Sequence, residues 1–525
     1  MKLLRIPRTC LVLLPALALL AGCDHHGSDD KGGSSPPPTD TPPPTRGSLI
    51  QSPPTRIASL NEAELIAKLA AGENGAALVD LFGSPSCGVD AYYLQYHTVG
   101  ATDEATTASG ALMVPSGTAA DCQGPRPILL YAHGTSTDKA HNIADLGNDS
   151  NAEGLLMAAV FASHGYIVVA PNYAGYDSST LPYTAYLNAE QSANDMMDAL
   201  AAARSALPVG TATTTTDDGR LFITGYSQGG HVAMATHRAM EAAGKTVTAS
   251  APMSGPYALA AFGDAVFYGQ VSGGSPIFLT MMIAGYQRAY GNVYGATTDV
   301  FEARYANGID TLLPTTVSRS TLYDEGKLPQ YELFSSTPPD PAYAAYTPPT
   351  TPEDMAWAWA LGFGPDNLIT NAYRLAYLND ATANPDGGWP NTTTGMPPAA
   401  PANALRQAFA KNDLRNWTPV APMLLCAGDE DPTVFYLNTQ LMQSYWAAIG
   451  ATPPVTVLDV DAAKTDNDPY DAIKTGFAAL KNTVAAAAVA GGADDGGARA
   501  VAEVYHSALV PPFCLSAVRS MFNSL

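Results

Sequence analysis

The chain has 525 residues, of which 46% are hydrophobic and only 14% are charged. This composition is typical of a globular protein and excludes a coiled coil or a fully disordered chain. Acidic residues outnumber basic ones by 48 to 26, which gives a formal net charge of −22. A nucleic-acid-binding surface needs clustered Lys and Arg, and the sequence contains no such cluster. We therefore expect no nucleic-acid partner.

The N-terminal segment has the pattern of an export signal. A basic start, residues 1–8, precedes an apolar run at 11–20 that is too short to span a bilayer as an ordinary helix. The run ends in Leu-Ala-Gly-Cys at 20–23, which resembles the site cut by the bacterial lipoprotein signal peptidase. The resemblance implies a signal peptide over 1–22, a lipid on Cys23 and an exported protein anchored to a bacterial membrane. Release outside the cell is the alternative destination.

The next segment is rich in Gly, Ser, Pro, Thr and Asp and has almost nothing to bury. We predict that residues 23–55 form a disordered tether that holds the following domain away from a membrane. We expect no later stretch to be apolar and long enough to form a transmembrane helix.

Four cysteines follow the signal and Cys23, and an even number in an exported protein predicts two disulfides. The sequence leaves three pairings open. We favour Cys87–Cys122, which brackets an N-terminal sheet region, together with Cys426–Cys514, which would tie a late strand to the C-terminal segment.

Short apolar runs alternate with helix-forming runs through the middle of the chain. This alternation predicts a mostly parallel sheet covered by helices on both faces. Alternating side chains at 90–115 predict an antiparallel meander at the leading edge of that sheet. The predicted strands lie at 127–132, 166–171, 221–224, 246–253 and 420–426, and the predicted helices at 153–164, at 189–206 and after Gly230.

Residues 256–418 interrupt the alternation and are rich in Pro, Gly and aromatic side chains. We predict that they form an insertion that covers the sheet as a cap. The sheet domain would then comprise residues 56–255 and 419–525.

A G-x-S-x-G motif lies at 225–229, directly after a predicted strand and before a predicted helix. This strand–turn–helix context is that of a nucleophile elbow. The sharp turn strains the serine backbone, so the residues two positions away on either side must be small. We predict that the Ser227 hydroxyl projects above the sheet edge as a nucleophile and that the Gln228 N–H stabilises an oxyanion.

The partners of Ser227 are sought in the chain order serine, acid, histidine that this motif's fold uses. Only His231, His237 and His506 follow Ser227, and the first two lie on the helix that leaves the motif. His506 is therefore the candidate general base.

The acid is expected just after the late strand at 420–426, where Asp429, Glu430 and Asp431 follow one another. The G-x-x-D-x-x-V spacing selects Asp431, with Asp429 as second and Glu430 as third choice. Asp431 would hold the His506 tautomer and stabilise the imidazolium. A second oxyanion donor is expected from the loop after strand 127–132, and we predict the N–H of Thr135.

The runs Tyr131–Thr135, Val169–Tyr176 and Gly225–Gly230 resemble the secreted lipase and esterase branch of the α/β-hydrolase superfamily, which includes bacterial secretory lipases and the lipase A type from yeasts. The resemblance implies an α/β-hydrolase fold, with a mostly parallel central sheet covered by helices and an inserted cap over the serine. It also implies ester hydrolysis through an acyl-enzyme.

We therefore expect a serine carboxylic ester hydrolase that acts on apolar or aromatic esters, such as lipids or polyester fragments, because an aromatic-rich cap favours an apolar pocket. A serine peptidase or acyltransferase stays open, since the same three residues cleave amides and transfer acyl groups. A non-catalytic, surface-binding lipoprotein is the alternative from another class. The sequence contains no metal- or nucleotide-binding motif, so we expect no metal and no cofactor.

The lipid anchor predicts the distribution of a Cys23→Ser variant in an expressing bacterium. Without the thiol no lipid is attached, so the protein should move from the membrane fraction to the soluble fraction on immunoblots. Cys10→Ser is the matched control, because Cys10 lies in the segment expected to be removed, and it should distribute like the wild type. Unchanged membrane partitioning of Cys23→Ser would contradict the anchor.

Overall fold

The computed structural model describes residues 44–71, 75–147, 152–209 and 214–525. The predicted signal peptide, Cys23 and the predicted tether up to residue 43 lie outside the described residues. The last part of the predicted tether, 44–55, is described, and there the chain is already ordered. The backbone N–H groups of Gly47 and Ile50 donate to the carbonyl oxygens of His97 and Gln95, at 2.8 and 2.9 Å. Order at 44–55 departs from the predicted disordered tether, because main-chain pairing needs no apolar side chains.

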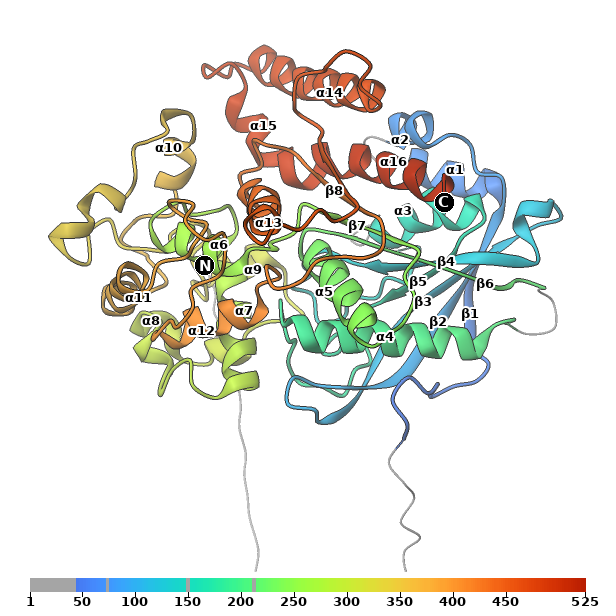
Figure 1. The fold of residues 1–525 in the computed structure, drawn as a ribbon, viewed down its shortest axis with the longest axis horizontal. Coiled ribbons are helices and arrows are strands. Elements are labelled where there is room, and N and C mark those ends of the chain that lie inside the picture. Colours follow the sequence, from blue (N-terminus) through green and yellow to red (C-terminus); the bar gives the residue numbers. More distant parts are fainter. Residues whose placement is uncertain (1–43, 72–74, 148–151, 210–213) are drawn as a thin grey trace, which may run out of the picture. The chain divides into compact units, whose positions relative to one another are not determined.

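The described strands form a single nine-stranded sheet. The strands are β1 (Thr55–Leu60), β2 (Gly88–Val99), β3 (Ala105–Ser116), β4 (Pro125–Ala132), β5 (Ile167–Pro171), β6 (Thr216–Tyr226), β7 (Ala249–Met253), β8 (Met423–Ala427) and β9 (Val455–Asp459). Their order across the sheet is β1-β2-β3-β5-β4-β6-β7-β8-β9 (Figure 1). The pairs from β5 to β9 are parallel, whereas β1, β2 and β3 pair antiparallel along the leading edge. The predicted sheet is confirmed.

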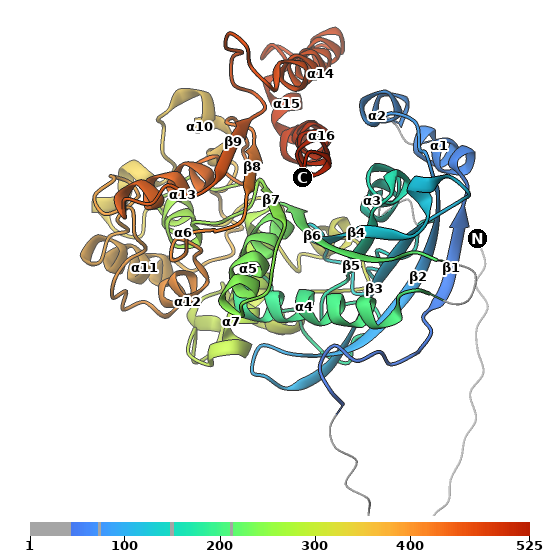
Figure 2. The ribbon, with the colours of Figure 1, turned by 45° about the vertical axis from the view of Figure 1, so that its right-hand side comes forward.

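The helices cover both faces of the sheet. They are α1 (Glu62–Ala70), α2 (Gly75–Phe82), α3 (Ala152–Val160), α4 (Ala189–Ala206), α5 (Gln228–Ala242), α6 (Leu259–Phe267), α7 (Ser275–Tyr290), α8 (Ala303–Ala306), α9 (Arg319–Asp324), α10 (Glu353–Ala360), α11 (Asn371–Ala383), α12 (Ala404–Asn412), α13 (Leu437–Ala448), α14 (Asp471–Ala490), α15 (Ala498–Val504) and α16 (Val510–Asn523). Figure 2 shows α4 and α5 on one face, and α3 and α16 on the other.

The buried central strands explain the uninterrupted apolar runs in the sequence. In β5, Val168 and Ala170 point into the core shared with α3 and α16, whereas Ile167 and Val169 point into the core shared with α4 and α5. Because successive side chains of a strand face opposite sides, a strand covered on both sides needs apolar residues at every position.

Residues 256–418, predicted as the cap, lie between β7 and β8 and contain helices α6 to α12. All of these helices except α10 contribute side chains to a separate apolar cluster. The two ends of this segment meet, since the Leu414 N–H donates to the Tyr257 carbonyl oxygen at 2.9 Å. Nearby, the buried Asp413 accepts the Ala260 N–H at 3.0 Å and pairs with the buried Arg415 at 2.9 Å. The strands that flank the insertion, β7 and β8, therefore remain neighbours in the sheet.

Both favoured disulfides are present. Cys87 bonds Cys122, and Cys426 of β8 bonds Cys514 of α16. The second bond joins two elements that are 88 residues apart and fixes the C-terminal helix to the sheet.

The C-terminal helical run 498–523 is long and apolar enough to cross a membrane by length and hydropathy, so the expectation that no later stretch meets these criteria was wrong. Half of its apolar window is buried inside the protein, and its α16 part packs on the sheet. The disulfide between its Cys514 and Cys426 of β8 also ties the run to the sheet. We therefore interpret the run as a core helix.

Removing the Cys426–Cys514 bond should lower the free energy of unfolding. In the chain-entropy description, a loop of this length stabilises the folded state by about 4 to 5 kcal/mol. A Cys426→Ala/Cys514→Ala variant should therefore unfold at clearly lower urea concentration. The Cys87→Ala/Cys122→Ala variant, whose loop is shorter, should lose slightly less. An unchanged unfolding midpoint for the first variant would refute this stabilising role.

Candidate active site

Ser227 occupies the turn between β6 and α5. Its backbone has φ of 60° and ψ of −121°, a left-handed conformation that residues with side chains rarely adopt. The Ser227 N–H donates to the Met253 carbonyl oxygen of β7 at 3.0 Å, and its own carbonyl oxygen accepts the Gly230 N–H at 2.9 Å. These bonds hold the strained residue between the sheet and the first turn of α5.

The glycines of the motif allow β6 and α5 to approach β4. A Cβ atom on Gly225 would lie 2.3 Å from the carbonyl oxygen of Gly229, and one on Gly229 would lie 2.0 Å from that of Ala132. Both distances are far shorter than any van der Waals contact, so a side chain at either position would force the turn away from the sheet.

His506 lies on a π-helical turn, Tyr505–Leu509, between α15 and α16. Two prolines, Pro511 and Pro512, follow in the first turn of α16. A proline ring clashes with the carbonyl group four residues earlier, and the wider π-turn relieves this conflict. The turn is closed by the Val510 N–H, which donates to the Tyr505 carbonyl oxygen.

The structure brings Ser227, His506 and Asp431 together. The His506 Nε2 atom lies 2.8 Å from the Ser227 Oγ atom, and the His506 Nδ1 atom lies 2.6 Å from the Asp431 Oδ2 atom. The Asp431 side chain is completely buried, and the His506 side chain is 13% exposed. Three residues that are widely separated in the sequence thus form one continuous chain of hydrogen bonds.

Backbone groups fix the orientation of the Asp431 carboxylate. Its Oδ1 atom accepts the N–H groups of Thr433 and Val434, at 2.9 and 3.1 Å. This leaves Oδ2 to face His506. An ionised carboxylate only accepts hydrogen bonds, so the Nδ1 atom of His506 carries the proton and its Nε2 lone pair points at the Ser227 hydroxyl.

The other two acidic candidates lie elsewhere. Asp429 and Glu430 are exposed, and the Glu430 carboxylate pairs with the Lys481 ammonium at 2.5 Å. Partial burial and the nearby Asp461 and Glu430 carboxylates raise the pKa of Asp429.

The two histidines of α5 are buried away from Ser227. Burial lowers the pKa of His231 to about 4, and its Nε2 atom lies 2.9 Å from the Asn412 carbonyl oxygen. His237 contacts the Ser250 hydroxyl and the Glu241 carboxylate. Both residues help α5 to pack.

Tyr226 is a contributor that the sequence analysis missed. Its hydroxyl donates to the His506 carbonyl oxygen at 2.6 Å, and its ring centroid lies 5.0 Å from the imidazole. Tyr226 thereby holds the π-turn against the nucleophile turn. It occupies the unspecified second position of G-x-S-x-G, so only its size and its adjacency to Ser227 could have drawn attention to it.

The loop that contains Thr135 lies beside the same site. The Thr135 hydroxyl is 2.7 Å from that of Tyr186, which lines a pocket together with Ser227 and Gln228. The Gly134 N–H donates to the Glu153 carboxylate at 3.1 Å. Gln228 begins α5, so its N–H belongs to the unpaired donors of a helix N-terminus. The oxyanion roles of the Gln228 and Thr135 N–H groups stay predictions.

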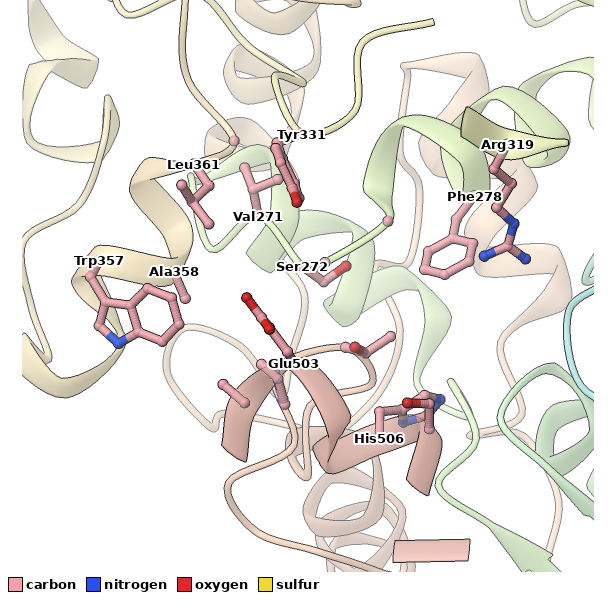
Figure 3. Close-up of a pocket in the computed structure, with 17 residues that line it drawn as sticks. Val271, Ser272, Phe278, Arg319, Tyr331, Trp357, Ala358, Leu361, Glu503 and His506 are labelled. Carbon is pink, nitrogen blue, oxygen red and sulfur yellow. The ribbon is translucent and has the colours of Figure 1, made fainter. Parts of the chain in front are cut away.

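Two cavities meet at this site. A small apolar pocket of about 30 Å³ contains Ser227 and Gln228 and is closed by Leu259, Phe262 and Met282. An open cleft of about 420 Å³ lies on the His506 side, with Trp357 on one flank and Phe278 on the other (Figure 3). Phe278 and Thr433 line both spaces.

No cluster of three or more potential ligand side chains suited to a metal ion occurs among the described residues.

Comparisons with known proteins agree with this geometry. The prolyl oligopeptidase family matches residues 155–275, a stretch that includes Ser227. A ligand-bound form of the rice cell wall degrading esterase LipA from Xanthomonas oryzae is 26% identical and aligns over 91% of this chain and 98% of its own, with a TM-score of 0.64. Another LipA structure is 28% identical over 79% of this chain and 91% of its own, with a TM-score of 0.59. The protein is a serine hydrolase of the α/β-hydrolase fold.

Proteins with much lower sequence identity to this chain share the fold. A protein of Legionella pneumophila with only 16% identity aligns over 91% of this chain and 97% of its own, with a TM-score of 0.61. No curated protein sequence matches the chain.

For this serine hydrolase we predict that Asp431→Asn lowers kcat on the order of 10³- to 10⁴-fold. The Thr433 and Val434 N–H groups would keep the amide oxygen, so the amide NH₂ would face His506 and stabilise the tautomer whose Nε2 atom is already protonated. Asp429→Asn is the matched control and should change kcat less than about threefold. Equal losses in steady-state kinetics would disprove the assignment of Asp431.

Proposed function

We propose that the protein is a carboxylic ester hydrolase in which Ser227 is the nucleophile, His506 the general base and acid, and Asp431 the residue that orients the imidazole. The observation that carries this proposal is the unbroken Ser227–His506–Asp431 chain of hydrogen bonds, at 2.8 and 2.6 Å.

In the first half of the reaction the Ser227 Oγ atom attacks the ester carbonyl carbon while His506 Nε2 takes the hydroxyl proton. The carbonyl oxygen becomes negative and receives hydrogen bonds from the Gln228 and Thr135 N–H groups. As the intermediate collapses, the carbon–oxygen bond to the alcohol breaks and His506 returns the proton to the leaving alkoxide. The acyl group is now an ester of Ser227.

In the second half water attacks the acyl carbon and gives one proton to His506. The bond to the Ser227 Oγ atom then breaks, and the proton passes from His506 back to that oxygen. The free acid leaves, and the enzyme returns to its initial state. The buried Asp431 carboxylate stabilises the imidazolium in both halves without taking its proton.

The cavities favour hydrolysis of an ester with an apolar acyl group. The pocket beside Ser227 is lined mainly by apolar side chains and suits the acyl part, whereas the cleft beside His506 suits the leaving alcohol. The width of that cleft admits water to the acyl-enzyme, which favours hydrolysis over acyl transfer. The similarity to the LipA esterase extends over nearly the whole chain, whereas the peptidase family matches only residues 155–275.

Export and lipid anchoring through Cys23 belong to the same proposal. The two disulfides support it, because such bonds form and persist in oxidising compartments outside the cytosol.

The function is tested by comparing 4-nitrophenyl butyrate with the 4-nitroanilide of the same acid. The wild type should hydrolyse the ester at least about 100-fold faster than the anilide, and Ser227→Ala should lose at least about 10³-fold in kcat. Ser444→Ala, at a half-buried serine on α13 whose hydroxyl donates to the Gln440 carbonyl oxygen, is the matched control and should behave like the wild type. Equal turnover of anilide and ester would favour the peptidase alternative. Full activity of Ser227→Ala would rule out the proposed nucleophile.

A further inference from the structure

Arg319, the first residue of α9, is a cation without a carboxylate partner beside the active site. Its Nε atom donates to the Thr137 hydroxyl at 3.1 Å, and its Nη2 atom lies 3.5 Å from the Thr135 carbonyl oxygen. None of the ion pairs in the described part of the chain includes Arg319. The guanidinium is thus positioned by neutral groups and forms no ion pair with a described residue, although acidic residues outnumber basic ones by 48 to 26.

The guanidinium lies between two cavities. Arg319 lines the open cleft of about 420 Å³ that contains His506, and it also lines a neighbouring cleft of about 520 Å³ bordered by the hydroxyls of the 135–137 loop. In Figure 3 it lies next to Phe278, whereas Trp357 and Glu503 lie toward the opposite side of the cleft. The cleft therefore has a positive end beside the oxyanion loop and a negative group across from it.

The position of His506 decides which part of an ester faces Arg319. His506 protonates the leaving alcohol in the proposed reaction, and it lines the same cleft as Arg319. The acyl part is assigned to the apolar pocket beside Ser227, which Arg319 does not line. Whatever binds Arg319 is therefore attached to the alcohol.

We propose that Arg319 binds a carboxylate on the alcohol part of the substrate, so that the preferred substrates are O-acylated hydroxy acids. This inference rests on the proposed ester hydrolysis. Guanidinium groups bind carboxylates through paired, charge-assisted hydrogen bonds. Glu503 repels the same carboxylate and directs it toward Arg319. Hydrolysis of such an ester releases the acyl part as a carboxylic acid and the alcohol part as a free hydroxy acid.

The test compares 3-(butyryloxy)benzoate with 3-(butyryloxy)benzamide, two esters of equal shape that differ in one negative charge. The quantity measured is the ratio of their kcat/KM values, in which any general loss of activity cancels. The wild type should prefer the anionic ester by about tenfold, and Arg319→Gln should reduce the ratio to about one. Arg319→Lys should keep part of the preference, because it keeps the charge but loses the paired donors.

Two further variants separate a local contact from the overall charge. Glu503→Gln should raise the ratio, since it removes a repulsive charge from the cleft. Arg204→Gln makes the same change in net charge as Arg319→Gln on the exposed surface of α4, and its ratio should equal that of the wild type. Raising the ionic strength from about 0.05 to about 0.5 M should lower the wild-type ratio, because exposed charge pairs are screened.

The outcomes distinguish this inference from the proposed function. A wild type that hydrolyses the benzoate and the benzamide probe equally well, or an Arg319→Gln variant that keeps the preference, would overturn the role of Arg319 and leave ester hydrolysis standing. The role of Arg319 would also be overturned, with ester hydrolysis left standing, if the wild type hydrolysed 4-nitrophenyl butyrate but neither of the two probes. A wild type that hydrolyses none of the three esters would overturn both proposals.

Discussion

The site depends on a backbone conformation at Ser227 that a residue with a side chain normally avoids. Such a conformation costs on the order of 1 to 3 kcal/mol and persists only where the surroundings determine it. Here the surroundings are β4, β6 and β7, whose parallel pairing brings Ala132 and Met253 to either side of the turn. Because the glycines of the motif remove all side chains from these contacts, the sheet itself holds the hydroxyl in position.

The partner of this hydroxyl comes from 279 residues further along the chain, so several independent contacts are needed to place it. The disulfide between β8 and α16 fixes the helix that follows His506 to the strand that precedes Asp431. The π-turn carries the imidazole that lies beside the Ser227 hydroxyl, and the Tyr226 hydroxyl holds the backbone of that turn. Each contact restrains a different movement of the imidazole, and none of them duplicates another.

Much of this arrangement could be predicted from the sequence because its signals are local. The apolar strands, the elbow glycines and the spacing that selects Asp431 each depend on residues that are neighbours in the chain. The helix at 189–206 was predicted with the bounds that the structure has. The favoured cysteine pairing is also confirmed, since few cysteines leave few choices.

The remaining features could not be predicted because they depend on contacts between distant segments. The significance of Arg319 comes from Thr135 and Thr137, more than 180 residues away, and from the fact that none of the ion pairs among the described residues includes it. The π-turn arises from the prolines that follow His506, and hydrophobic periodicity in the sequence does not reveal a turn of this kind. The segment 461–500 was interpreted only as low in complexity, yet it contains the helix α14, because alanine is the strongest helix former.

The pairing between the 134–139 loop and the segment at Thr315 has a mechanical consequence. The Thr315 N–H donates to the Thr137 carbonyl oxygen at 2.8 Å, and the Lys139 N–H donates to the Thr315 carbonyl oxygen at 2.7 Å. A hinged movement that lifted this part of the insertion would therefore pull the loop that contains Thr135 along with it. The exposed Tyr331 and Leu361 line the cleft outside this pairing, so a molecule can enter there without separating Thr315 from the loop.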